Sequence, residues 1–212
     1  MDFINSDAQS IASFLSEPVQ VEEIYVYMQT NYGTSVTPFY TTLALWVGGI
    51  VLVALMKVKV DYEDDEFKDA TEHQKYMGRA LLFLAMGQLQ ALVVVLGDLY
   101  ILKIDCTHPF MLWLAAAITS FVFTLFIYTL VLTFGDLGKA IAVVMIVLQI
   151  AGSGGTYPIE LLPEFFQNVY LYFPFPYAIN AMREAISGLY QCDYAVFLVK
   201  LSLIHISEPT RP

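Results

Sequence analysis

The segment PFMLWLAAAITSFVFTLFIYTLVLTF, residues 109–134, contains no charged side chain and ends where Gly135 and Asp136 begin a polar turn. About 20 consecutive apolar residues are enough for a helix to cross the hydrocarbon core of a bilayer. Lipid offers the backbone no hydrogen bonds, so a segment of this kind satisfies its peptide groups by forming a helix. Residues 109–134 are therefore predicted to form a membrane-spanning helix.

Apolar runs of similar character lie on both sides of this segment. Of the 212 residues, 58% are hydrophobic and only 14% are charged, whereas soluble domains carry about a quarter charged residues. The predicted fold class is an all-α, polytopic membrane helical bundle in which residues 38–200 form the transmembrane domain. Five spans are predicted, at about residues 38–56, 80–102, 109–134, 140–157 and 194–206.

The basic residues predict an orientation, because cytoplasmic loops carry an excess of Lys and Arg. The segment 57–79 holds five of them, and the turn 135–139 holds one more, whereas the loops predicted to lie on the opposite side hold only Lys103 and Arg183. Residues 57–79 and 135–139 are therefore expected to face the cytoplasm. The N-terminal residues 1–37, the loop 103–108 and the segment 152–193 are expected to lie outside.

The stretch GSGGTYPIELLPEFFQ, residues 152–167, interrupts the fourth span with four Gly or Pro residues within seven positions. Backbone that such residues free at membrane depth must be satisfied by protein or by a water-filled cavity. Two arrangements remain open for residues 152–190. One is a helical hairpin that dips inward, broken at FPFP and continued by a helix through Met182 and Ile186; the other is an amphipathic helix lying at the membrane surface.

The same stretch carries a family resemblance. A glycine-rich helix end, the motif PIELLP, an aromatic helix, the break PFPYA and the helix AMRE are similar to the outer re-entrant element of type-2 ATP-binding-cassette exporters. Together with FLSEPVQVEE and NYGTSVTPFYTTLALWVGG, these motifs resemble the YhgE/Pip (phage infection protein) group over about residues 13–200. The expected element comprises Gly154, Gly155, Pro158, Glu160, Pro163, Pro174, Pro176, Arg183 and Glu184.

The resemblance also bears on both ends of the chain. Members of the group have six membrane helices, with a large extracellular domain after the first, so the resemblance implies that residues 1–37 are the tail of an ectodomain. The five spans would then be the last five. LSLIHISEPTRP, residues 201–212, is similar to a translated sequencing adapter and is interpreted as a non-native tail that truncates the last span. The alternative is a natural continuation of the helix.

Two sets of polar residues are candidates for function. In exporters of this kind the inner loop contacts an ATPase subunit, so the resemblance implies partner docking by residues 57–79, although the acidic run 61–66 alone favours a solvated linker. The polar side chains within the spans either line a pathway or form hydrogen bonds between helices. The docking candidates are Asp64, Asp65, Glu66, Lys68, Lys75 and Arg79, and the pathway candidates are Gln88, Gln90 and Gln149.

Other polar residues receive simpler interpretations. Asp98 lies near the outer end of its span and needs no special role, and Arg183 with Glu184 favours a local salt bridge over a gate. Cys106 and Cys192 fall on the same predicted side, so a disulfide is permitted there, but no sequence feature places them close together.

Several classes of function are not expected. A net charge of −10 argues against nucleic-acid binding, and there is no GxxxxGK[ST] motif for ATP hydrolysis and no constellation for catalysis, a metal or a cofactor. The resemblance implies an exporter permease subunit in a bacterial, Gram-positive-like cell membrane, paired as a homodimer or with a pseudo-symmetric partner and driven by a separate cytoplasmic ATPase. The alternative is a non-transporting cell-surface protein, either a phage receptor or a secretion accessory.

Overall fold

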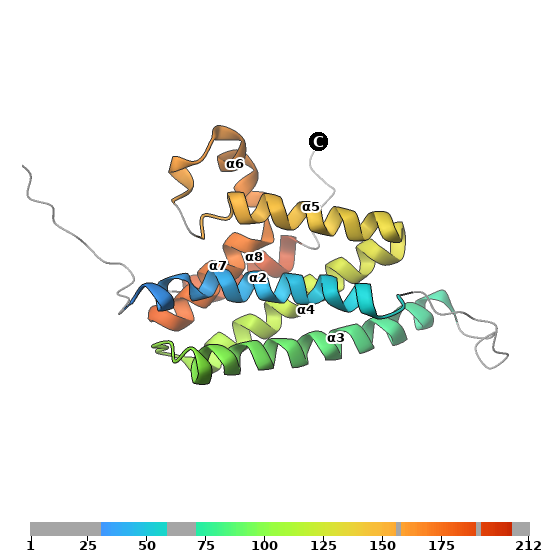
Figure 1. The fold of residues 1–212 in the computed structure, drawn as a ribbon, viewed down its shortest axis with the longest axis horizontal. Helices are drawn as coiled ribbons and strands as arrows, with labels where there is room; N and C mark the ends of the chain where they lie inside the picture. Colours follow the sequence, from blue (N-terminus) through green and yellow to red (C-terminus); the bar gives the residue numbers. More distant parts are fainter. Residues whose placement is uncertain (1–30, 59–70, 156–157, 190–191, 205–212) are drawn as a thin grey trace, which may run out of the picture.

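The computed structural model describes residues 31–58, 71–155, 158–189 and 192–204. Within these ranges every regular element is helical and there is no strand, which confirms the predicted all-α bundle. Figure 1 shows α2, α3 and α5 running along the length of the molecule, with the short helix α6 projecting at one end of α5. The helices are α2 (Tyr32–Leu55), α3 (Glu72–Leu96), α4 (Pro109–Phe134), α5 (Asp136–Gly152), α6 (Glu164–Val169), α7 (Pro174–Ser187) and α8 (Asp193–Ile204).

Three of these helices are long and apolar enough to cross a membrane: α2, α3 with its π-helical extension η2 (Gly97–Ile101), and α4. The other two predicted spans are shorter in the described residues. Helix α5 has 17 residues because the glycines after Ala151 stop it at Gly152, and α8 has 12 residues up to Ile204. Helix α5 therefore ends five residues before the predicted end of the fourth span at about residue 157.

The first two helices begin earlier than predicted because polar residues cap them. The Asn31 side chain accepts a hydrogen bond of 2.8 Å from the Thr34 backbone N–H, so α2 starts at Tyr32 and residues 32–37 are helical. Thr71 forms a capping box at the start of α3. As a result, the last eight residues of the predicted inner loop, 72–79, are helical.

Helix α4 lies at the centre of the bundle and packs against α2, α3, α5, α7 and α8. Its Phe123 ring lies 4.9 Å from the Trp46 ring of α2 and 5.5 Å from the Phe175 ring of α7, measured between centroids. The Trp46 indole also donates a 3.2 Å hydrogen bond to the Ala142 carbonyl of α5. Buried aromatic side chains contribute large apolar areas, so this cluster ties four helices together.

The outer surface of the bundle is apolar along much of its length. Helix α3 is the clearest case, since only 28% of its most apolar 18-residue window is buried inside the protein. Its exposed side chains include Leu81, Leu89 and Val93. A water-soluble protein rarely exposes so large a contiguous apolar surface, whereas a bilayer solvates it. The bundle is therefore that of a membrane protein.

Candidate functional site

The outer element begins where α5 ends. Gly154 takes a positive φ of 63°, a conformation that glycine adopts without strain, and the chain turns away from the helix. A Cβ atom at Gly152 would lie 2.7 Å from the Phe166 ring, and one at Gly155 would collide with the Phe39 ring of α2. The glycines therefore allow both the turn and the close packing of the element against α2 and α5.

The two halves of the element differ in burial. Its first half, the turn η3 (Ile159–Leu161), α6 and the turn η4 (Tyr170–Tyr172), has no buried residue, and Pro158, Glu160 and Pro163 are exposed. Its second half, α7, begins at Pro174, buries Pro176 and packs against α2, α4 and α8. Helix α7 thus lies within the bundle, while α6 projects from it (Figure 1).

Arg183 and Glu184 lie on α7, near its C-terminal end. The Glu184 side chain is fully buried, and the half-buried Arg183 donates a 3.1 Å hydrogen bond to the Asn180 side-chain oxygen. The next two carbonyls of α7 each accept a 3.0 Å hydrogen bond, from the backbone N–H groups of Thr107 and His108. This end of α7 is therefore fastened to the loop that precedes α4.

The two cysteines are both free and differ in exposure. Cys106 lies beside the end of α7, where its thiol donates a weak 3.5 Å hydrogen bond to the Ala185 carbonyl. Burial raises the pKa of the Cys106 thiol, and a hydrogen bond from the His108 backbone partly offsets that rise. Cys192 is exposed.

The three glutamines within the spans have different surroundings. Gln88 of α3 donates a 3.0 Å hydrogen bond to the Ala117 carbonyl of α4. Of the two interpretations given above, pathway lining or hydrogen bonding between helices, this bond corresponds to the second. Gln90 packs against the α2 backbone at Gly48 and borders a groove of about 350 Å³ between α2 and α3. Gln149 of α5 is fully buried, and neither its amide oxygen nor its amide nitrogen has a hydrogen-bond partner among the described residues.

Asp98 has a role that the sequence analysis missed. Its carboxylate is only 7% exposed and accepts a 2.6 Å hydrogen bond from the Thr41 hydroxyl, which links α3 to α2. The residue sits in η2, and π-helical turns are frequent at functional sites. A lone carboxylate next to Gly97 inside an apolar run was the available signal, because ionisable groups in spans usually have a partner in the protein.

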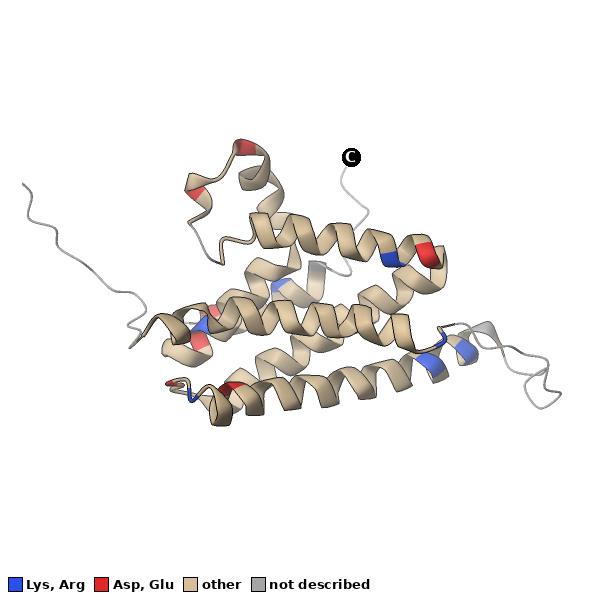
Figure 2. Cartoon of the chain, in the orientation of Figure 1, with Lys and Arg blue, Asp and Glu red and all other residues tan. Residues whose placement is uncertain are grey.

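Four of the seven Lys and Arg residues that the structure describes lie at the opposite end of the bundle. Figure 2 shows blue segments where α2 leads toward α3 and where α4 turns into α5, while the helices between the two ends are nearly free of charge. Arg79 of α3 donates hydrogen bonds from two of its nitrogens to the Lys57 carbonyl, which joins the two sides of the predicted inner loop. Four docking candidates, Asp64, Asp65, Glu66 and Lys68, lie outside the described residues, and Lys75 is on α3.

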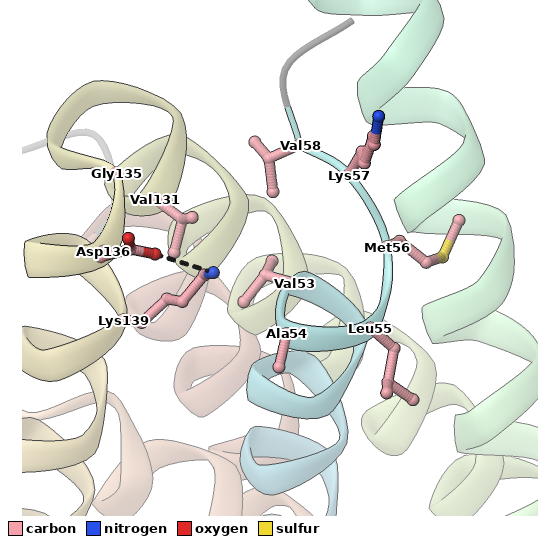
Figure 3. Close-up of a pocket in the computed structure, with 10 residues that line it drawn as sticks. All are labelled: Val53, Ala54, Leu55, Met56, Lys57, Val58, Val131, Gly135, Asp136 and Lys139. Carbon is pink, nitrogen blue, oxygen red and sulfur yellow. Dashed lines mark hydrogen bonds and ion pairs between the residues drawn. The ribbon is translucent and has the colours of Figure 1, made fainter.

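A pocket of about 500 Å³ opens at this basic end, between the end of α2 and the turn from α4 to α5 (Figure 3). Lys139 and Asp136 form an ion pair of 3.0 Å on its α5 side. The complete lining is Val53, Ala54, Leu55, Met56, Lys57, Val58, Val131, Gly135, Asp136 and Lys139.

The bundle thus combines apolar helices, a broken element at one end and a basic turn at the other. The family model described as "ABC-2 type transporter" matches residues 73–186, more than half of the chain. The chain belongs to the ABC-2 type transporter family. The matched range of this ABC-2 membrane domain runs from the first turn of α3 to the last turn of α7.

A curated relative of this ABC-2 domain is the uncharacterized protein YhgE of Bacillus subtilis (strain 168), which is 30% identical over 207 residues. The match covers 96% of this chain but only 26% of the relative, so the chain spans about a quarter of that protein's length. The resemblance to the YhgE/Pip group is thereby confirmed. No solved structure matches the chain significantly.

Proposed function

We propose that the chain is a permease-like subunit of an ABC-2 exporter in which a separate cytoplasmic subunit hydrolyses ATP. The observation that carries the proposal is the family match over residues 73–186. This range includes both the broken outer element and the turn that carries Lys139. The sequence has no phosphate-binding GxxxxGK[ST] loop, so the nucleotide would be bound by a partner.

The predicted cytoplasmic segment, residues 57–79, is suited to transmit a movement of that partner to the helices. Because Arg79 bonds the Lys57 carbonyl, the end of α2 and the second turn of α3 are tied together at the base of the segment between them. A partner that moves the segment therefore moves both helices. Helix α4, which packs against α2 and α3, would pass this movement into the centre of the bundle.

Substrate would leave beside the outer element. In this structure Gly152 of α5 packs closely against the Phe166 ring of α6, and Gly155 packs against the Phe39 ring of α2. Release of that packing would expose the buried face of α5, which carries Gln149. We assign Gln149 and Gln90 to the route, whereas Gln88 is used between α3 and α4.

The assembly would lie in a bacterial cell membrane of Gram-positive type, as a multi-pass protein with residues 57–79 and 135–139 in the cytoplasm. A homodimer, or a pseudo-symmetric pair, would enclose the route. Support comes from the distribution of Lys and Arg and from the Bacillus relative.

The test uses the full-length protein purified from its native membrane. We expect a P-loop ATPase to co-purify and to hydrolyse ATP in liposomes made from the same membrane lipids. Arg79→Gln is expected to reduce both the amount of bound ATPase and the hydrolysis rate, while Lys103→Gln at the opposite end leaves both unchanged. If no ATPase associates and ATP drives no movement of native lipids or glycans, the permease proposal is wrong and the cell-surface alternative is favoured.

A further inference from the structure

The pocket at the basic end is lined by both apolar and charged residues. Its lining includes the buried apolar side chains of Val53 and Val131 and the charged residues Asp136 and Lys139. Figure 3 shows the Lys139 ammonium pointing from α5 toward the end of α2, across the space between the two elements. An amphipathic ligand with an apolar body and an anionic end would match this lining.

The Lys139 ammonium can exchange its present partner. Its side chain is 38% exposed, whereas the Asp136 side chain that it pairs with is 96% exposed. Exposed ion pairs contribute little to stability, because both groups remain well solvated. An anion entering the pocket can therefore take the Lys139 ammonium at little cost, while Asp136 turns toward water.

The start of α5 adds a second favourable group. The helix begins after Gly135, which adopts a φ of 61° and makes no side-chain cap. The first N–H groups of a helix carry a partial positive charge and bind anions. Gly135, Asp136 and Lys139 all line the pocket, so the positive end of the helix lies beside the Lys139 side chain.

The pocket lies where the apolar helices α2 and α4 end. Helix α2 ends at Leu55 and α4 at Phe134, and the first charged residues, Lys57 and Asp136, come two positions later. The orientation in the proposed function places this end of the bundle at the cytoplasmic leaflet, where anionic lipids are held by basic pockets between helices. The inference rests on that orientation for the leaflet, but not on ATP-driven transport.

We propose that this pocket binds the phosphate headgroup of an anionic phospholipid, with Lys139 as the basic contact. One acyl chain then lies along Leu55 and the neighbouring apolar wall. The acidic run 61–66 follows three residues after Val58, so long-range charge does not favour the lipid. Selectivity for the anionic lipid comes instead from the groups that line the pocket. Among these groups the Asp136 carboxylate disfavours the lipid, because it repels the phosphate and competes for Lys139.

The experiment measures lipid selectivity of the full-length protein in nanodiscs that contain phosphatidylglycerol and phosphatidylcholine, by mass spectrometry of the lipids that stay bound. We expect phosphatidylglycerol to be enriched and Lys139→Gln to lower that enrichment about fivefold, the usual effect of one basic group near an anionic surface. Asp136→Asn is expected to raise it. Lys103→Gln, an exposed lysine at the other end of the bundle, is the matched control.

Each outcome decides the proposal. Equal enrichment in Lys139→Gln and Lys103→Gln overturns it, and so does a loss of enrichment in Asp136→Asn, because the ion pair would then be structural. Inorganic phosphate at millimolar concentration is expected not to displace the lipid; displacement would mean that the site binds free phosphate. The assay needs neither ATP nor an ATPase, so a failure of the permease proposal leaves this result intact.

Discussion

Replacing Gln149 by Met is expected to stabilise the helical bundle. The Gln149 amide is fully buried, and both of its polar atoms lack partners among the described residues. A buried polar group without a hydrogen bond costs about 1–3 kcal/mol. Met is unbranched, similar in length and apolar, and it adapts to irregular core space. Gln149→Met should therefore raise the free energy of unfolding by about 1–3 kcal/mol.

Gln88 provides the matched comparison, because the same substitution removes a hydrogen bond there instead of an unsatisfied amide. Gln88→Met deletes the 3.0 Å bond to the Ala117 carbonyl. Hydrogen bonds between membrane helices contribute about 0.6 kcal/mol on average. The two variants are thus expected to shift stability in opposite directions, although both exchange a glutamine for a methionine within an apolar helix.

The assay is thermal unfolding of the full-length protein in one detergent, followed by intrinsic Trp fluorescence. For a domain of roughly 150–250 residues, 1 kcal/mol corresponds to roughly 2–4 °C in melting temperature. A melting temperature that falls in Gln149→Met, or that changes alike in both variants, would refute the reasoning and show that the Gln149 amide is satisfied in the protein. If Gln149 also lines the route, the stabilised variant should lose transport.

Three further substitutions test the packing by the same unfolding measurement. Thr41→Val removes the hydroxyl that donates the 2.6 Å hydrogen bond to Asp98 and should lower stability by about 1–3 kcal/mol; an unchanged melting temperature would contradict the proposed link between α2 and α3. Gly138→Ala should destabilise by at least about 1–3 kcal/mol, since its Cβ would meet the α4 backbone, 2.8 Å from the Leu130 carbonyl carbon. Gly78→Ala, whose Cβ would meet nothing within 4 Å, should instead stabilise by about 0.5–1 kcal/mol, and equal effects of the two alanines would argue against the close approach of α4 and α5.

The bundle and its central helix follow from local properties of the chain. Residues 109–134 were predicted with the bounds that α4 has in the structure, because an uncharged run of that length can satisfy its backbone in lipid only as a helix. Capping signals were present in Asn31 and Thr71, but the apolar runs alone placed the helix starts too late. Family motifs in residues 152–190 were also readable, since they depend on the order of Gly, Pro and aromatic residues.

Tertiary structure decided which polar residues have partners. Gln88 and Gln149 occupy equivalent apolar surroundings in the sequence, yet only the packing of α3 on α4 brings a carbonyl to Gln88. Likewise, Asp98 accepts a hydrogen bond from Thr41, which lies 57 residues earlier in the chain. The pocket, too, forms between distant segments, the end of α2 and the start of α5. Hydropathy and capping act over a few neighbouring residues, so a single sequence records them. Contacts between distant helices depend on how the whole bundle packs, and that arrangement is visible only in three dimensions.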